Sequence, residues 1–267
     1  MTGQVPLRKA RLALPLVLLP VLLAGCSGSS DGPGAESRRT SGTADTSGAA
    51  ATADAFRPDP ARLPRTRTAA RDLLDRVIAD PDSFGSGVVK RSPYESDPAT
   101  WPVLGPDCVW QQEEPADSVL AALTRTFEVP AEKGKGPLRL AAVVTVHRTR
   151  EDAAWEMAES IEETMRCPTQ QLRGGETIGS MVAAALLGGE SAQDSSEDFL
   201  SEVGEFRSSE LGGPHHYAWQ QAQTLQFTVA VTGKGAKGRT RGEIDALVTQ
   251  AHGAMLVRLE NAVEKRS

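Results

Sequence analysis

The stretch LRLAAVVTVH at residues 138–147 decides the class of fold. Its apolar residues alternate with the others in a period of two, which is typical of a strand with one buried face. They are Leu138, Leu140, Ala142, Val144 and Val146. Thr149 follows, with Asp152 three residues further on, and this spacing is typical of a capping box at a helix start. The stretch therefore predicts a strand that leads directly into a helix.

The helix predicted after Thr149 carries an apolar stripe that we expect to face the sheet. Residues three or four apart lie on one side of a helix, and five apolar residues have this spacing. They are Ala154, Met157, Ala158, Ile161 and Met165. The helix should end at Cys167-Pro168, because proline cannot continue it.

The same order recurs toward the end of the chain. Two strands are predicted at 215–223 and 224–232, followed by a Gly/Lys-rich loop and a long helix. The apolar side of that helix contains Ile244, Leu247, Val248, Ala251, Met255, Leu259 and Val263. This order predicts an α+β domain, an antiparallel sheet with helices packed on one side. Two strand-strand-helix halves are an option, supported only weakly by the tripeptide Trp-Gln-Gln at 110–112 and 219–221.

The domain is predicted to span residues 66–267. Thr66 or Thr68 could cap a first helix. Its shared apolar face contains Ala70, Leu73, Leu74, Val77 and Ile78. Asp80-Pro81 should stop this helix, and further strands are expected at 108–112 and 120–129.

The first 25 residues have the order of a secretory signal peptide. A basic start precedes an apolar stretch at 12–24, which is shorter than the roughly 20 residues that a membrane-spanning helix needs. The tetrapeptide Leu23-Ala24-Gly25-Cys26 resembles the lipobox of bacterial lipoproteins. The resemblance implies cleavage before Cys26 and lipid attachment to its sulfur. We therefore expect an exported protein, held at the extracytoplasmic face of the cell membrane by its lipid.

Residues 26–65 are expected to form the lipidated N-terminus and a flexible tether. They are rich in Gly, Ser, Thr, Ala and Asp and almost devoid of large apolar residues, so they cannot bury enough surface to offset their ordering entropy. Removing residues 1–25 takes away three basic and no acidic residues, so the formal charge of −6 becomes −9. Such an acidic chain lacks the excess of basic residues that binds the phosphates of nucleic acid.

Cysteine usage fits an exported protein. With Cys26 assigned to lipid, Cys108 and Cys167 remain as an even pair, and disulfides persist outside the cytoplasm. Two separate buried thiols are the alternative. We favour the bridge.

Two motifs resemble functional sites but lack the residues that the corresponding chemistry needs. The run GKGAKGRT at 233–240 has the spacing of a phosphate-binding loop, but Arg239 stands where that loop needs lysine, and we expect a mobile basic connector. His215 and His216 are adjacent in a strand, so they point to opposite faces and do not suit one metal ion. We predict no catalytic residue, no cofactor and no metal ligand, and hence no enzyme.

Three further features have two interpretations each. Trp101, Trp110 and Trp219 could line a pocket, but in a domain with few aromatic residues we favour the core. The acidic stretch 190–205 lacks the pattern of a calcium loop and is expected to be a solvated excursion. The apolar stretch 181–187 is expected to be a core-packing turn rather than a membrane contact.

The layout of the domain resembles the extracellular sensor domains of PknH-type actinobacterial kinases and related lipoproteins. The resemblance lies in a first helix, an Asp-Cys followed by Trp110, a strand-to-helix segment ending in a second cysteine, and a closing strand and helix. It implies a non-catalytic ligand-sensing or binding module in the cell envelope. Its partner would be a small molecule or an envelope protein. The alternatives are an interaction or scaffold protein of the envelope that binds another protein, and an extracytoplasmic enzyme whose scattered catalytic residues one sequence does not reveal. That family has two disulfides, whereas this chain can form one.

Overall fold

The computed structural model describes residues 57–183 and 196–265. The predicted signal peptide, the lipobox with Cys26 and most of the tether lie outside these residues. Within the described part, no helix is long and apolar enough to cross a membrane.

The described residues form an antiparallel sheet with three α-helices packed against it, so the predicted α+β class is confirmed. The helices are α1 (Arg67–Val77), α2 (Arg150–Arg166) and α4 (Arg241–Val263), with a 3-10 turn η1 (Pro81–Phe84). The strands are β1 (Val89–Glu95), β2 (Trp101–Leu104), β3 (Trp110–Glu113), β4 (Val119–Val129), β5 (Leu138–His147), β6 (Gln170–Arg173), β7 (Glu176–Ala183), β8 (Asp198–Ser208), β9 (Gly212–Thr224) and β10 (Phe227–Lys234).

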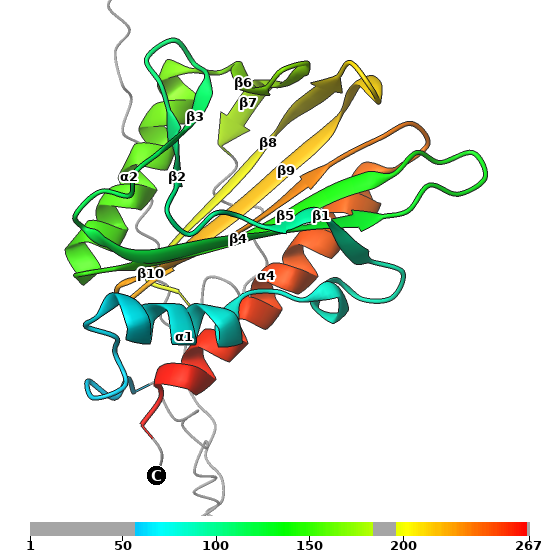
Figure 1. The fold of residues 1–267 in the computed structure, drawn as a ribbon. Helices are drawn as coiled ribbons and strands as arrows, with labels where there is room; N and C mark the ends of the chain where they lie inside the picture. Colours follow the sequence, from blue (N-terminus) through cyan, green and yellow to red (C-terminus); the bar gives the residue numbers. More distant parts are fainter. Residues whose placement is uncertain (1–56, 184–195, 266–267) are drawn as a thin grey trace, which may run out of the picture. The chain divides into compact units, whose positions relative to one another are not determined.

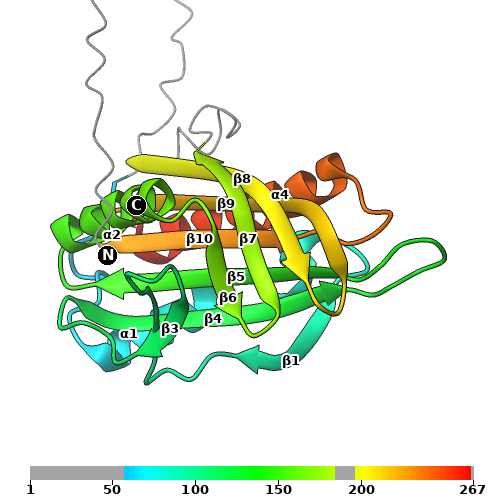
Figure 2. The same cartoon turned by 90° about the horizontal axis from the view of Figure 1, so that it is seen from above.

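Eight strands make one curled sheet in the order β1-β4-β5-β10-β9-β8-β7-β6, and β2 and β3 form a separate ribbon. Figure 1 shows α1 and α4 together beneath the sheet. Seen from above, α2 and the β2–β3 ribbon lie over the opposite, concave face (Figure 2). The helices thus cover both faces, so the predicted packing on one side is corrected: adjacent side chains of β9 bond to opposite helices, Gln220 to Thr249 of α4 and Gln221 to Glu156 of α2. The concave side holds the site described below.

The stretch at residues 138–147 forms strand β5 with the predicted bounds, between β4 and β10. Its predicted apolar face is buried in the core under α1 and α4, with Val144 and Val146 fully inaccessible. The predicted apolar sides of α1 and α4 pack in the same core, and Thr66 caps α1. Residues expected at the end of the tether also touch the domain, since Asp59 donates its backbone N–H to the carbonyl of Val263.

The capping box at Thr149 and Asp152 is present, but the predicted buried stripe of α2 is wrong. Only Met157 of that stripe is buried, and Met165 is 80% exposed. The inward face of α2 instead contains Ala153, Glu156, Met157, Ser160, Glu163 and Thr164. The reason is that the concave face beneath α2 is polar, with Gln221 and Thr228, so hydrogen-bonding side chains rather than aliphatic ones fit against it.

Two other expectations are corrected. Much of the acidic stretch is strand β8, paired with β7 and β9, and its Leu200 and Glu202 are buried. The carboxylate of Glu202, which faces the cavity, interrupts the apolar side of this strand. Residues 181–183 end strand β7 rather than forming a turn, and the rest of the apolar stretch lies outside the described residues.

The Gly/Lys-rich run packs against the domain rather than forming a free connector. A Cβ on Gly233 would lie 2.6 Å from Cγ2 of Ile244, so this glycine lets α4 approach β10 closely. The side chain of Arg239 is 1% exposed and its Nη1 binds carboxylates of Glu132 and Glu243 at 3.0 and 2.7 Å. The arginine that replaces the lysine of a phosphate loop therefore has a structural role.

Candidate functional site

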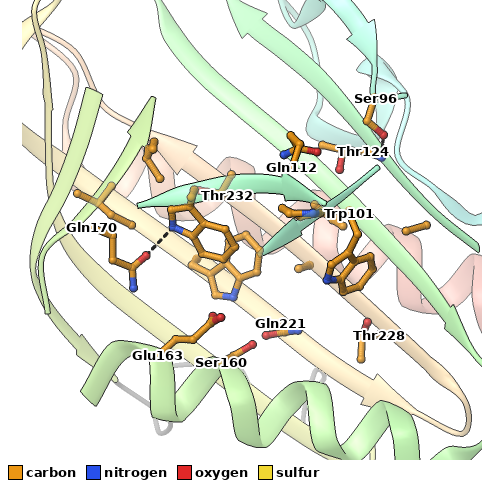
Figure 3. A pocket seen from close by; sticks show the side chains of 18 of the residues that line it. Ser96, Trp101, Gln112, Thr124, Ser160, Glu163, Gln170, Gln221, Thr228 and Thr232 are labelled. Atoms are coloured by element: carbon orange, nitrogen blue, oxygen red, sulfur yellow. Dashed lines mark hydrogen bonds between the residues drawn. The ribbon is translucent and has the colours of Figure 1, made fainter. Parts of the chain in front are cut away.

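A cavity of about 660 Å³ opens on the concave face of the sheet. It lies between the inward face of α2, the β2–β3 ribbon and strands β4, β5 and β7–β10. Figure 3 shows Glu163 and Ser160 rising from α2 toward the same space that Trp101 enters from the ribbon. A cavity of this size accommodates a small organic molecule.

The three tryptophans line this cavity, so their predicted place in the core is wrong. Trp101 and Trp110 come from the β2–β3 ribbon and Trp219 from β9. Nε1 of Trp110 donates a 2.8 Å hydrogen bond to Oε1 of Gln170, and the ring of Trp101 meets that of His147 edge-on at 6.4 Å. The Trp110 and Trp101 rings are thus held as walls of the cavity.

The ribbon that carries two of these rings is fastened to the end of α2. Cys108 and Cys167, the pair that the sequence favours, are joined by a disulfide with their Cα atoms 5.5 Å apart. Arg166, the last residue of α2, donates from Nη1 to the carbonyl of Gly105 at 3.1 Å. These ties connect the loop between β2 and β3 to the helix and fix the ribbon over the concave face.

Glu156 is the centre of a buried polar network beneath the cavity. Its Oε1 accepts a hydrogen bond from Nε2 of Gln221 at 3.0 Å, and its Oε2 accepts one from Oγ1 of Thr228 at 2.8 Å. Nε2 of His147 lies 2.6 Å from the same Oε2. The carboxylate of Glu156 is therefore well compensated, whereas Oε1 of Gln221 remains a buried acceptor without a partner in the described residues.

Two other carboxyl groups of α2 have no such compensation. Glu159 and Glu163 face the cavity one turn apart, and neither forms a side-chain hydrogen bond or ion pair with a described residue. Burial, and next the like charge of Glu159, raise the pKa of Glu163 to about 7. Burial, and next Glu156, raise the pKa of Glu159 as well. Both groups would gain from a positive charge or a hydrogen-bond donor nearby.

The lining of the cavity also contains one cation, Lys234. Nζ of Lys234 lies 3.4 Å from Oε2 of Glu176, a buried carboxylate that also binds Arg139 and Arg173. Burial lowers the pKa of Lys234, and Glu176 opposes that shift. Lys234 therefore belongs to a buried ion-pair cluster and does not offset Glu159 and Glu163.

The remaining candidate residues lie elsewhere. Nε2 of His216 lies 2.7 Å from Oδ1 of Asp245, and Nε2 of His215 lies 2.9 Å from the carbonyl of Leu211. Among residues 57–183 and 196–265, no group of three potential metal ligands is found. Sequence reasoning missed Glu156, Glu163 and Gln221. The spacing of Glu156, Ser160 and Glu163 is a helical period that could have revealed the polar inward face.

No protein-family model matches this chain, and no curated protein matches it. Among solved structures, the chain is similar to the crystal structure of the extracellular domain of PknH from Mycobacterium tuberculosis, with 12% sequence identity and a TM-score of 0.42. The match covers 75% of this chain and 98% of that chain. It assigns no ligand and no residue role to this chain.

Proposed function

We propose that this domain binds a small molecule in its concave cavity, without turnover, as the ligand-binding part of an exported, lipid-anchored envelope protein. The observation that carries the proposal is the set of three tryptophan rings around one preformed cavity. Exposed aromatic walls with a few convergent polar groups are typical of ligand sites. The lipobox at Cys26 and a disulfide between Cys108 and Cys167 support the location.

Filling the cavity tests the binding proposal. Ser160→Trp places a large ring in the cavity, and Ala154→Trp places the same ring on the exposed side of α2 as a matched control. The neutral dye Nile red should bind to the wild type and to Ala154→Trp, with a rise in its emission, and at least ten-fold more weakly to Ser160→Trp. Equal binding to all three proteins, or no binding to any, would contradict the proposal.

The anchor is tested separately by mass spectrometry of protein purified from native membranes. The expected mature chain begins at Cys26 and carries acyl groups on that residue. A Cys26→Ser form with the same processing and the same membrane association as the wild type would overturn this part of the proposal. Any co-purified ligand should be recovered chemically unchanged, because we assign the domain no catalytic step.

A second candidate function is binding of an envelope protein through the outer face of α2. Trp155 and Met165 on this face are 62% and 80% exposed. A photo-crosslinker at Met165 should give one discrete adduct in cells, and Trp155→Ser should weaken it. The same crosslinker at the exposed Lys133 is the control. Equal adducts from both positions would argue against a specific interface.

A further inference from the structure

The cavity is lined by far more negative than positive side chains. Its carboxyl groups belong to Glu95, Asp97, Glu156, Glu159, Glu163 and Glu202, and its one ammonium group belongs to Lys234. Lys234 is already matched by Glu176. An anionic ligand would add a like charge to this lining, in a partly enclosed space where charges interact more strongly than in bulk water.

Most of these carboxyl groups have partners within the described residues. Nε of Arg125 binds Glu95 at 2.9 Å, the backbone N–H of Ala99 donates to Asp97, and Thr164 donates to Glu202. Glu156 has the three partners given above. Glu159 and Glu163 are the exceptions, and both line the cavity one helical turn apart on α2.

An independent observation also points to a ligand with donor groups. Gln221 is 1% exposed and lines the cavity, yet its Oε1 has no hydrogen-bond partner in the described residues. Its Nε2 is already bound to Glu156, so the oxygen is the atom of this side chain that still lacks a partner. Figure 3 shows Gln221 next to α2, between Glu163 and Thr228 in this view. A buried acceptor without a partner is unfavourable, and a bound donor would relieve that cost.

The tryptophan rings also favour a positively charged ligand. The faces of indole rings are negative and attract ammonium groups, most strongly where water is excluded. A neutral polyol could donate to the carboxyl groups but would leave the repulsion between Glu159 and Glu163 in place. A cation offsets that repulsion and can also bind to the faces of the indole rings.

We infer that the cavity takes an organic cation, with a protonated amine or quaternary ammonium group beside Glu159 and Glu163 and an apolar body against the tryptophan rings. This inference rests on the proposed binding function. It adds the charge class of the ligand, which Nile red, being neutral, does not test.

Three probes with the same octyl chain test the charge class below their micelle-forming concentrations. They are octyltrimethylammonium, octyl sulfate and octyl glucoside, each measured by displacement of Nile red at pH 8. The cation should bind at least ten-fold more tightly than the other two. If the glucoside or the sulfate binds as tightly as the cation, the charge assignment is wrong although the binding function stands. If Nile red does not bind in the cavity, both the charge assignment and the proposed binding function are wrong.

Substitutions on α2 test whether the positive charge of the ligand binds beside Glu163. Glu163→Gln should weaken binding of octyltrimethylammonium about five- to ten-fold and leave octyl glucoside unchanged. Glu162→Gln is the matched control, because Glu162 lies on the same turn of α2, is 61% exposed and pairs with Arg166. Equal effects of the two substitutions would overturn the proposal.

The pH dependence gives a further check. Glu163 is faced by Glu159, Glu162 and Arg166 on α2 and by Glu202 on β8. Affinity of the wild type for octyltrimethylammonium should rise between pH 6 and pH 8 as Glu163 ionises, and Glu163→Gln should lose most of this rise. An unchanged pH profile in Glu163→Gln would contradict the assignment.

Discussion

Nε1 of Trp110 donates its hydrogen bond to Oε1 of Gln170, and this contact joins residues that are 60 positions apart in the chain. Gln170 is 2% exposed and begins strand β6, just after the disulfide at Cys167. The orientation of the Trp110 ring in the cavity therefore depends on a strand at the far edge of the sheet.

Gln170→Leu should release this ring. Removing the acceptor leaves the indole N–H without its partner, which we expect to cost about 1 kcal/mol of unfolding free energy in urea. The near-ultraviolet circular dichroism of the tryptophans and the affinity for Nile red should both change. Gln171→Leu, at the exposed neighbouring position, should alter none of these, and identical behaviour of the two variants would contradict the role of Gln170.

Loss of the disulfide should affect both stability and the cavity. Cys108 and Cys167 are 59 residues apart, and closing such a loop is worth up to about 4 kcal/mol in the chain-entropy model. Replacing both by alanine should lower the unfolding free energy by about 2–4 kcal/mol and weaken Nile red binding, because the β2–β3 ribbon is no longer fastened to α2. Reductant should destabilise the wild type and leave the double variant unchanged. A wild type insensitive to reductant in urea would refute this prediction.

Glu163 should make the domain less stable as pH rises. Burial raises its folded-state pKa to about 7 from 4.5, so the folded domain binds more protons than the unfolded chain between these values. Its contribution to the unfolding free energy therefore falls across this window. Glu163→Gln should be more stable than the wild type at pH 8, by about 1 kcal/mol after allowance for solvent screening, and equally stable near pH 4. Glu162→Gln should show no such pH-dependent difference in urea unfolding.

His252 should make the domain less stable as pH falls. It is 1% exposed, its Nε2 lies 3.2 Å from the carbonyl of Val229, and burial lowers its pKa from 6.5 to about 4. The unfolded chain binds the extra proton first, so stability present above pH 6.5 is lost as the pH falls toward 4, by on the order of 3 kcal/mol. His252→Gln should remove this slope in urea unfolding. His216→Gln is the control, and equal slopes in both variants would disprove the assignment.

Local patterns predicted the three α-helices of the described residues and five of their strands, but they did not predict β1, β2, β6, β7 or β8. The alternation over 138–147 and the capping box at Thr149 and Asp152 depend on neighbouring residues only, and both are present in the structure. The inward face of α2 could not be predicted in this way. Whether a helix buries Ile161 or Glu163 depends on the surface it covers, and here that surface contains Gln221 and Thr228 from the other end of the chain.

The sequence by itself determined the α+β class, the approximate positions of the main helices and strands, and the two cysteines available for a bridge. These follow from periodicity, capping and counting. Only the tertiary structure decided that Trp101, Trp110 and Trp219 leave the core and surround one cavity. Their meeting depends on the curl of an eight-stranded sheet and on the ribbon tied to α2. Such contacts join residues far apart in the chain, so no local pattern encodes them.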